Sequence, residues 1–119
     1  MVKKKRVDEI AEQAAFFASL ADPTRLRLFK LLIRQKPAGS LCVNALSALL
    51  GVTQSAVSQH LKVLRSVGLV QGERRGYHIH YRVKPESLRR CQRLLKETLS
   101  RNSDSVLYQQ NCPVKKTRG

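Results

Sequence analysis

Residues 44–70 read NALSALLGVTQSAVSQHLKVLRSVGLV and hold the signals that decide the fold. A short helix over about 44–50 should stop at Gly51, because glycine tolerates the left-handed conformation that ends helices. Thr53 is a good N-cap for a second helix that runs to about Ser66. Two helices joined by a short turn that contains glycine form a helix-turn-helix. We therefore expect that unit here.

The second of these helices has two chemically different faces. Val57, Leu61 and Leu64 share one side, which should anchor the helix in a core. The opposite side carries polar residues: Ser55, Ser58, Gln59, Lys62 and Arg65. Hydrogen-bonding groups on an anchored helix can meet base edges in a DNA groove. We expect His60, on the same helix, to touch DNA or solvent.

After the second helix the pattern changes from helical to alternating. Residues 69–83 read LVQGERRGYHIHYRV and place Tyr77, Ile79 and Tyr81 on one side of a strand. We expect a β-hairpin whose connecting turn is the basic stretch 73–76. A hairpin that directly follows a helix-turn-helix makes a winged helix.

Further helices should flank this unit. Residues 7–21 place apolar side chains on one face, namely Ile10, Ala14, Phe17 and Ala21. Asp22 and Pro23 suit the N-cap and first position of a second helix, and a last helix follows Pro85. The predicted fold is mainly α: a winged helix-turn-helix of about five helices and a two-stranded wing. A DNA-binding and dimerisation domain should span 1–101, followed by a basic, mobile tail over 102–119.

The composition favours a nucleic-acid partner. The 119 residues include 23 Lys and Arg against 8 Asp and Glu, a formal net charge of +15. Basic side chains gain affinity for phosphates by releasing counterions, whereas no segment has the amphipathic character needed to bind a membrane surface. Without a long apolar run or a secretory signal, we expect no membrane span and a cytoplasmic location. In that reducing compartment three widely spaced cysteines should stay free thiols, ligands or sensors.

Three stretches together resemble the ArsR/SmtB group of bacterial winged-helix repressors over about residues 10–99. They are ADPTRLRLFKLL at 21–32, LCVNALSALLGVTQSAVSQHLKVLRSVGLV at 41–70 and GERRGYHIHYRV at 72–83. The resemblance implies a homodimer, with the first and last helices at its interface, that binds a double-stranded DNA operator near its own promoter. It also implies release from DNA when a metal ion, metalloid or other inducer binds. No cofactor is expected to be required for DNA binding.

The residue pattern and the resemblance agree on the DNA-binding side chains. We expect contacts from Gln54, Ser55, Ser58, Gln59 and Lys62 at the major groove and its backbone, and from Arg74 and Arg75 in the wing. Gln59 can make paired hydrogen bonds to adenine, and Lys62 suits a phosphate.

The inducer site of the resembled family is incomplete in this chain. Members that sense arsenite commonly carry a box similar to ELCVCDL, where this chain has SLCVNAL at 40–46. Cys42 matches the first cysteine, but Asn44 replaces the second, and we expect Asn44 to cap the helix instead. A second family site, rich in His and Asp on the last helix, is also missing, and Cys91 is the only soft ligand there.

The three cysteines Cys42, Cys91 and Cys112 remain as candidate ligands. Three thiolates suit trivalent arsenic or antimony, or another soft metal, provided that the tail folds back or crosses to a second subunit. Alternatively, Cys91 is only a small apolar residue on its helix. A third possibility is a thiol redox or reactive-sulfur switch, in which arginines near Cys91 (Arg89, Arg90 and Arg93) lower its pKa.

Other classes of function are less well supported. A basic winged helix also suits an architectural or RNA-binding protein without a sensor, or a repressor controlled by its own level. His78 and His80 could bind a metal, although contacts with phosphate or water suit wing histidines better. No nucleophile-base pair, phosphate-binding glycine loop or carboxylate pair stands out, so we do not expect an enzyme.

Overall fold

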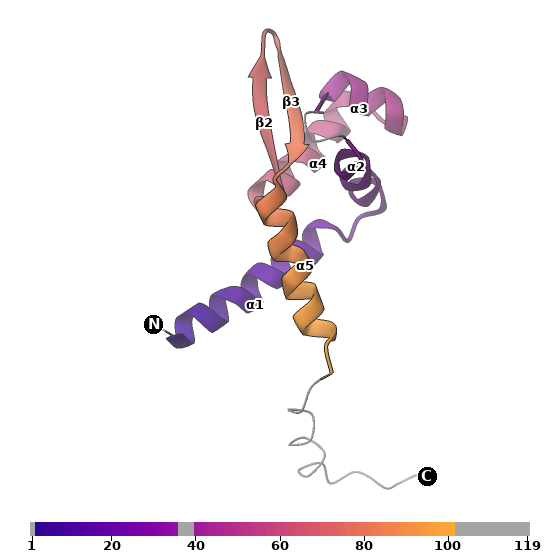
Figure 1. The fold of residues 1–119 in the computed structure, drawn as a ribbon. Helices are drawn as coiled ribbons and strands as arrows, with labels where there is room; N and C mark the ends of the chain where they lie inside the picture. The colour runs from indigo at the N-terminus through magenta and orange to yellow at the C-terminus, as the bar shows by residue number, and fades with distance from the viewer. Residues whose placement is uncertain (1, 36–39, 102–119) are drawn as a thin grey trace, which may run out of the picture.

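The computed structural model describes residues 2–35 and 40–101, which form five helices and three strands (Figure 1). In chain order they are α1 (Val2–Ser19), α2 (Pro23–Ile33), β1 (Leu41–Cys42), α3 (Val43–Leu50), α4 (Gln54–Ser66), β2 (Val70–Arg75), β3 (His78–Val83) and α5 (Pro85–Leu99). The predicted winged helix-turn-helix is confirmed. The expected tail over 102–119, with Cys112, lies outside the described residues.

The turn between α3 and α4 is held by local hydrogen bonds. Gly51 takes the left-handed conformation with φ +70°, and its N–H donates to the carbonyl of Ser47 at 2.9 Å. The Ser47 hydroxyl donates to the carbonyl of Val52 at 2.5 Å. Thr53 then caps α4, since its side-chain oxygen accepts from the N–H of Ala56 at 3.0 Å. Both predicted boundary residues, Gly51 and Thr53, are therefore confirmed.

The core lies between α2, α3, α4 and the base of the wing. Its fully buried side chains are Leu28, Leu46, Val57, Leu61, Leu64 and Leu69. Three of these, Val57, Leu61 and Leu64, form the apolar side of α4 that the sequence predicts. Truncating one such leucine to alanine costs about 2–5 kcal/mol of folding free energy, so α4 is rigidly attached through this side.

The wing differs from its prediction at the turn. Strand β2 continues to Arg75, with Arg75 paired to His78 of β3, so residues 73–75 lie in the strand and not in the turn. The turn consists of Gly76 and Tyr77, and Gly76 has φ +66°. The prediction failed because this end of the hairpin extends away from the core. Both faces of the strand are solvated there, so polar residues give no alternating signal.

A third strand, β1, was not predicted. It pairs antiparallel with β3, with Leu41 opposite Tyr81 and Cys42 opposite His80, and it makes the sheet order β1-β3-β2. A two-residue strand is too short to show a pattern in sequence. The same segment corrects the expected cap, because Cys42 occupies the N-cap position of α3 and Asn44 lies exposed inside the helix.

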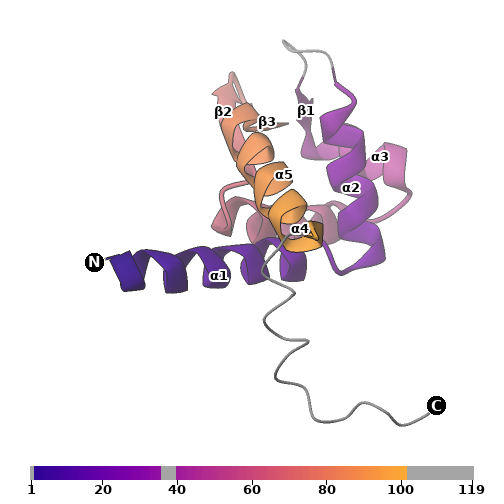
Figure 2. The same ribbon diagram turned by 60° about the horizontal axis from the view of Figure 1, so that its bottom comes forward.

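Helices α1 and α5 pack against each other at the end of the molecule opposite the wing tip (Figure 1, Figure 2). Arg90 donates two hydrogen bonds to the carboxylate of Glu12, both at 2.6 Å. The side-chain amide of Gln13 donates to the carbonyl of Leu94 at 2.6 Å. A bidentate ion pair and an interhelical hydrogen bond therefore fix the crossing of the two helices.

The predicted apolar side of α1 faces solvent in the single chain. All four of its residues, Ile10, Ala14, Phe17 and Ala21, are exposed. Phe16 and Ser19 are buried instead. Helical spacing correctly predicts the helix, but the face that packs inside this chain is a neighbouring one.

Candidate nucleic-acid interface

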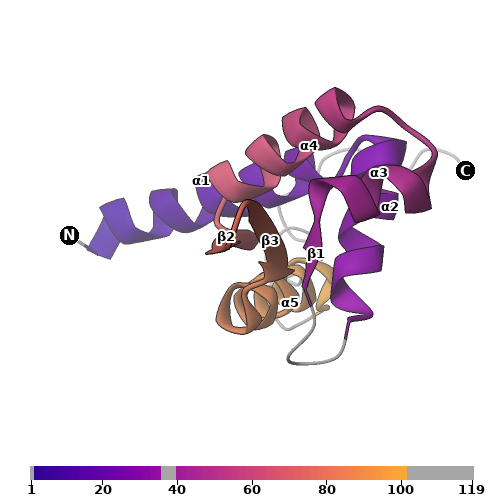
Figure 3. The same cartoon turned by 90° about the horizontal axis from the view of Figure 1, so that it is seen from above.

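The polar side of α4 is open to solvent along its length. The side chains of Gln54, Ser55, Ser58, Gln59 and Lys62 are all exposed, whereas the opposite side of the helix is buried. The helix thus presents hydroxyl, amide and ammonium groups from a fixed support. The wing, α3 and α4 lie toward the viewer in Figure 3, with α1 and α5 behind them.

The wing adds positive charge beside this helix. Arg74 and Arg75 are exposed in the outer half of β2. The guanidinium of Arg75 lies 3.4 Å from the carboxylate of Glu73, a loose and solvated pair that leaves the arginine free to exchange partners. The structure therefore places the predicted arginines on a projecting arm next to α4.

Tyr77 is a candidate contact residue that the sequence analysis missed. It was assigned to the apolar side of the hairpin, yet it is 98% exposed at the turn of the wing. A fully exposed aromatic ring beside two arginines suits stacking or wedging against nucleic acid. The sequence did contain a signal for this position: glycine commonly begins a two-residue hairpin turn, so Gly76 could have placed Tyr77 in the turn.

His60 is partly buried and contacts two residues of the segment that begins α2. Its Nδ1 lies 3.3 Å from the guanidinium of Arg25, and its Nε2 lies 3.8 Å from the carboxylate of Asp22. The side chain is still 20% exposed, so solvent reaches part of it, and contact with DNA stays a prediction. His60 thus links α4 to the start of α2.

Arg25 extends this link to the end of α1. Its guanidinium donates to the backbone carbonyls of Ser19 and Ala18. Its backbone N–H donates to the carboxylate of Asp22 at 2.9 Å, which confirms Asp22 as the cap of α2 and lowers the pKa of that carboxyl. One arginine thus joins the last turn of α1, the first turn of α2 and the recognition-helix candidate α4. We call this group, Asp22, Arg25 and His60, the corner junction.

Cys42 lies beside the candidate interface. It lines a cleft of about 270 Å³ that runs between the wing and α4. Ser58 of α4 and His78 of β3 line the same cleft. Cys42 therefore shares one cleft with both elements that carry the predicted DNA-binding residues.

Cys91 has a different environment on α5. It is partly buried against the core, and this burial raises the pKa of its thiol. The predicted lowering by nearby arginines is not observed, and Arg90 is engaged with Glu12. A raised pKa makes a thiol less reactive at neutral pH, which weakens the case for Cys91 as a redox switch.

The described residues do not by themselves form a metal site. Over 2–35 and 40–101, no three side chains of His, Cys, Asp or Glu gather closely enough to hold an ion. A three-ligand site that uses Cys42 would therefore need Cys112 or a second subunit. Within the same ranges, no helix is long and apolar enough to cross a membrane.

The fold and the site together define a winged helix-turn-helix DNA-binding protein: α4 has a buried apolar side and an exposed polar side, and a basic wing lies next to it. Residues 22–71 match the family described as "Bacterial regulatory protein, arsR family". The "Arsenic resistance transcriptional regulator ArsR1" of Pseudomonas putida is 34% identical over 96 residues, which cover 81% of this chain and 73% of that protein. The chain belongs to the arsR family of bacterial regulatory proteins.

Two further similarities extend this finding. A "Transcriptional repressor SmtB homolog" of Synechocystis sp. is 45% identical over 75 residues, which are 63% of this chain but only about half (54%) of that protein. The solved structure of an "ArsR-like Transcriptional Regulator" from Rhodococcus sp. RHA1 has a TM-score of 0.65 and 26% identity, covering 86% of this chain and 87% of that one. These names describe transcriptional regulators, in agreement with the prediction that the chain is not an enzyme.

Proposed function

We propose that this chain is a homodimeric transcriptional repressor that binds a double-stranded DNA operator and leaves it when an inducer binds its thiols. The observation that carries the proposal is the exposed polar side of α4 beside the basic wing. The relatives named as a repressor and as an arsenic-resistance regulator support it. The protein would act in the cytoplasm, where its DNA partner lies and where thiols stay reduced.

The geometry of α4 and the wing supports the proposed DNA contacts. In the proposal, the helix lies in the major groove with Gln59 at base edges and Lys62 at a phosphate. The remaining contacts come from Gln54, Ser55 and Ser58 on the helix and from Arg74 and Arg75 in the wing. Tyr77 joins the arginines at the tip of the wing.

The dimer follows from apolar side chains that a single chain leaves exposed on α1 and α5. Ile10 of α1 is 66% exposed and Leu99 of α5 is 72% exposed, and Phe17 and Leu95 of the same two helices are also exposed. Such surface on two adjacent helices gains free energy when a second copy covers it. A twofold axis through α1 and α5 would set two copies of α4 about one DNA turn apart.

The inducer class follows from the thiols. Soft sulfur ligands favour trivalent arsenic or antimony, or another soft metal. Cys42 is the best-placed ligand because its cleft touches both Ser58 and the wing. Cys91 and Cys112 are the other candidate ligands, from the same subunit or its partner. A metalloid bound at this cleft would displace the wing relative to α4.

Fluorescence anisotropy on an operator found by footprinting tests the proposal. With a reductant present, arsenite should release the wild-type protein from the operator, and single Cys→Ser changes at 42, 91 and 112 should identify the ligands. If all three variants respond like wild type, the thiol site is wrong. Release only by an oxidant or persulfide, reversed by reductant, would indicate a redox switch instead. Absence of a short, near-palindromic footprint would point to an architectural protein.

A further inference from the structure

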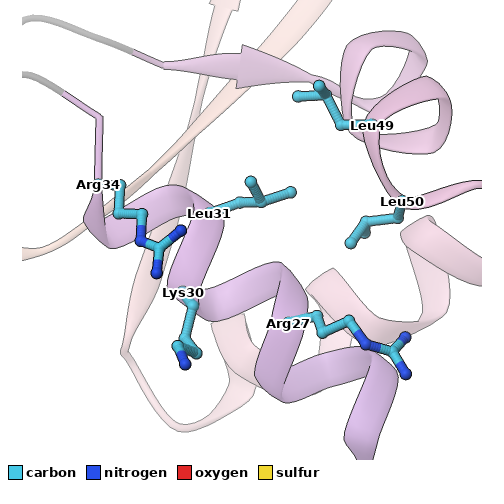
Figure 4. Close-up of a pocket in the computed structure, with 6 residues that line it drawn as sticks. All are labelled: Arg27, Lys30, Leu31, Arg34, Leu49 and Leu50. Carbon is cyan, nitrogen blue, oxygen red and sulfur yellow. The ribbon is translucent and has the colours of Figure 1, made fainter.

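A groove between α2 and α3 has a composition that DNA binding does not explain (Figure 4). Its volume is about 290 Å³, close to the lower end of small-molecule sites. Its lining residues are Arg27, Lys30, Leu31 and Arg34 of α2 with Leu49 and Leu50 of α3. None of the predicted DNA contacts or cysteines lines it.

The inner part of the groove is apolar. In Figure 4 the side chains of Leu31 and Leu50 point toward each other across the gap between the helices, and Leu49 lies at the edge of the same gap. Leu49 is 60% exposed, an unusual state for a leucine in a concave site. Covering these methyl groups with a hydrocarbon chain would release water and stabilise the complex.

The outer part of the groove is positively charged. Arg27, Lys30 and Arg34 fall at i, i+3 and i+7 along α2, so they share one side of the helix. Among the described residues, none of the three forms an ion pair, and no acidic side chain lines the groove.

We propose that this groove binds a small amphipathic organic anion, an aliphatic carboxylate whose chain lies on the leucines and whose head group meets the cations. A DNA phosphate would use the cations but would leave the leucines without a partner, so the combination favours a ligand that has both parts. The site lies apart from the Cys42 cleft. It therefore requires neither the proposed operator nor the proposed inducer, and its test stands independently of theirs.

Titration of the ¹⁵N-labelled protein with three probes tests the chemistry. Octanoate carries both a chain and a charge, acetate only the charge, and octan-1-ol only the chain. We expect octanoate to give saturable shifts of backbone amides in α2 and α3, and the other two probes to bind far more weakly. Equal responses to all three probes, or shifts by octanoate that avoid α2 and α3, would overturn the proposal.

Matched variants test the residues. Lys30 and Lys96 are each the basic residue in the last turn of their helices, so Lys30→Gln and Lys96→Gln perturb the helix ends alike. We expect only Lys30→Gln to weaken octanoate binding, by roughly fivefold for an exposed ion pair. Leu49→Ser should weaken it as well. Ile33→Ser, at an exposed α2 residue that does not line the groove, should not.

A DNA titration completes the test. A random-sequence duplex should bind wild type and Lys30→Gln equally under the same salt conditions. If Lys30→Gln instead loses duplex binding, while octanoate binds both proteins alike, the groove is a DNA contact and the proposal is wrong.

Discussion

Lys62 and Gln59 lie three positions apart on the exposed side of α4, yet their chemistry predicts different contributions to binding. An ammonium group neutralises a phosphate of any sequence, whereas an amide can pair with the edge of adenine. Both side chains are exposed in the structure, so replacing either one should leave the fold unchanged.

Lys62→Ala should weaken binding to all DNA sequences by a similar factor. The plot of log affinity against log salt should flatten by about one unit, because one phosphate contact is lost. Gln59→Ala is the matched variant: it should leave the slope unchanged and cost about 1–3 kcal/mol only on the preferred sequence. An unchanged affinity and slope for Lys62→Ala would place this residue off the interface.

For single residues, the sequence predicts those contacts whose two partners are close together in the chain. Asp22 and Thr53 could be predicted as caps, because a capping side chain accepts its hydrogen bond from a backbone N–H only three residues later, as both do here. The contact of His60 with Arg25 could not be predicted, because the two residues are 35 positions apart and no local pattern reports such a contact. Cys42 was placed correctly before a helix, but its strand pairing was not foreseen.

Between elements, the corner junction fixes the position of α4 relative to the end of α1 and the start of α2. We expect Arg25→Ala and His60→Ala each to lower the free energy of unfolding and to weaken DNA binding, although neither residue lies on the exposed side of α4. In a double-mutant cycle measured by urea unfolding, their coupling should be about 1 kcal/mol. Strictly additive losses would show that the two side chains do not interact.

The ion pair of Glu12 and Arg90 should make the packing of α1 on α5 sensitive to pH. Hydrogen bonds from Arg90 lower the pKa of Glu12 in the folded protein. The resulting stabilisation is complete above the unfolded-state pKa of about 4.3 and is lost as the pH falls through the lower folded-state value. The side chains are 34% and 36% exposed, so solvent screening keeps the pair to about 1 kcal/mol or less.

Glu12→Gln should therefore be less stable than wild type at pH 7. The difference should begin to shrink as the pH falls below the unfolded-state pKa of about 4.3, and it should be lost once the pH has passed the lower folded-state pKa of Glu12. Chemical unfolding of both proteins across this range measures it. A difference that is constant with pH would mean that the ion pair contributes nothing to stability.

For the whole molecule, the exposed apolar side chains of α1 and α5 determine the expected assembly. Phe17 of α1 and Ile33 of α2 are 42% and 41% exposed, so they form a matched pair. Phe17→Asp should convert the proposed dimer to monomers and weaken operator binding severely, since a buried unpaired charge opposes association. Ile33→Asp should leave the dimer intact. Analytical ultracentrifugation distinguishes them, and a dimeric Phe17→Asp would place the interface elsewhere.

The order of the helices and the presence of the wing could be predicted because periodicity and turn residues are local signals. The inward face of α1 could not, because Phe16 and Phe17 are equally apolar neighbours and only tertiary packing buries the first. The corner junction and β1 were missed for the same reason. The α2–α3 groove also depends on how these two helices pack together, and the sequence pattern of neither helix reveals that.

The pairing of β1 with β3 connects Cys42 directly to the wing. Its backbone shares one hydrogen-bond ladder with the strand that supports the wing, and it is also the N-cap residue of α3. A bound group that displaces Cys42 would therefore act directly on β3 at His80. Because Tyr81, the next residue of β3, is buried in the core, we expect such a displacement to affect both the direction of the wing and the packing at its base.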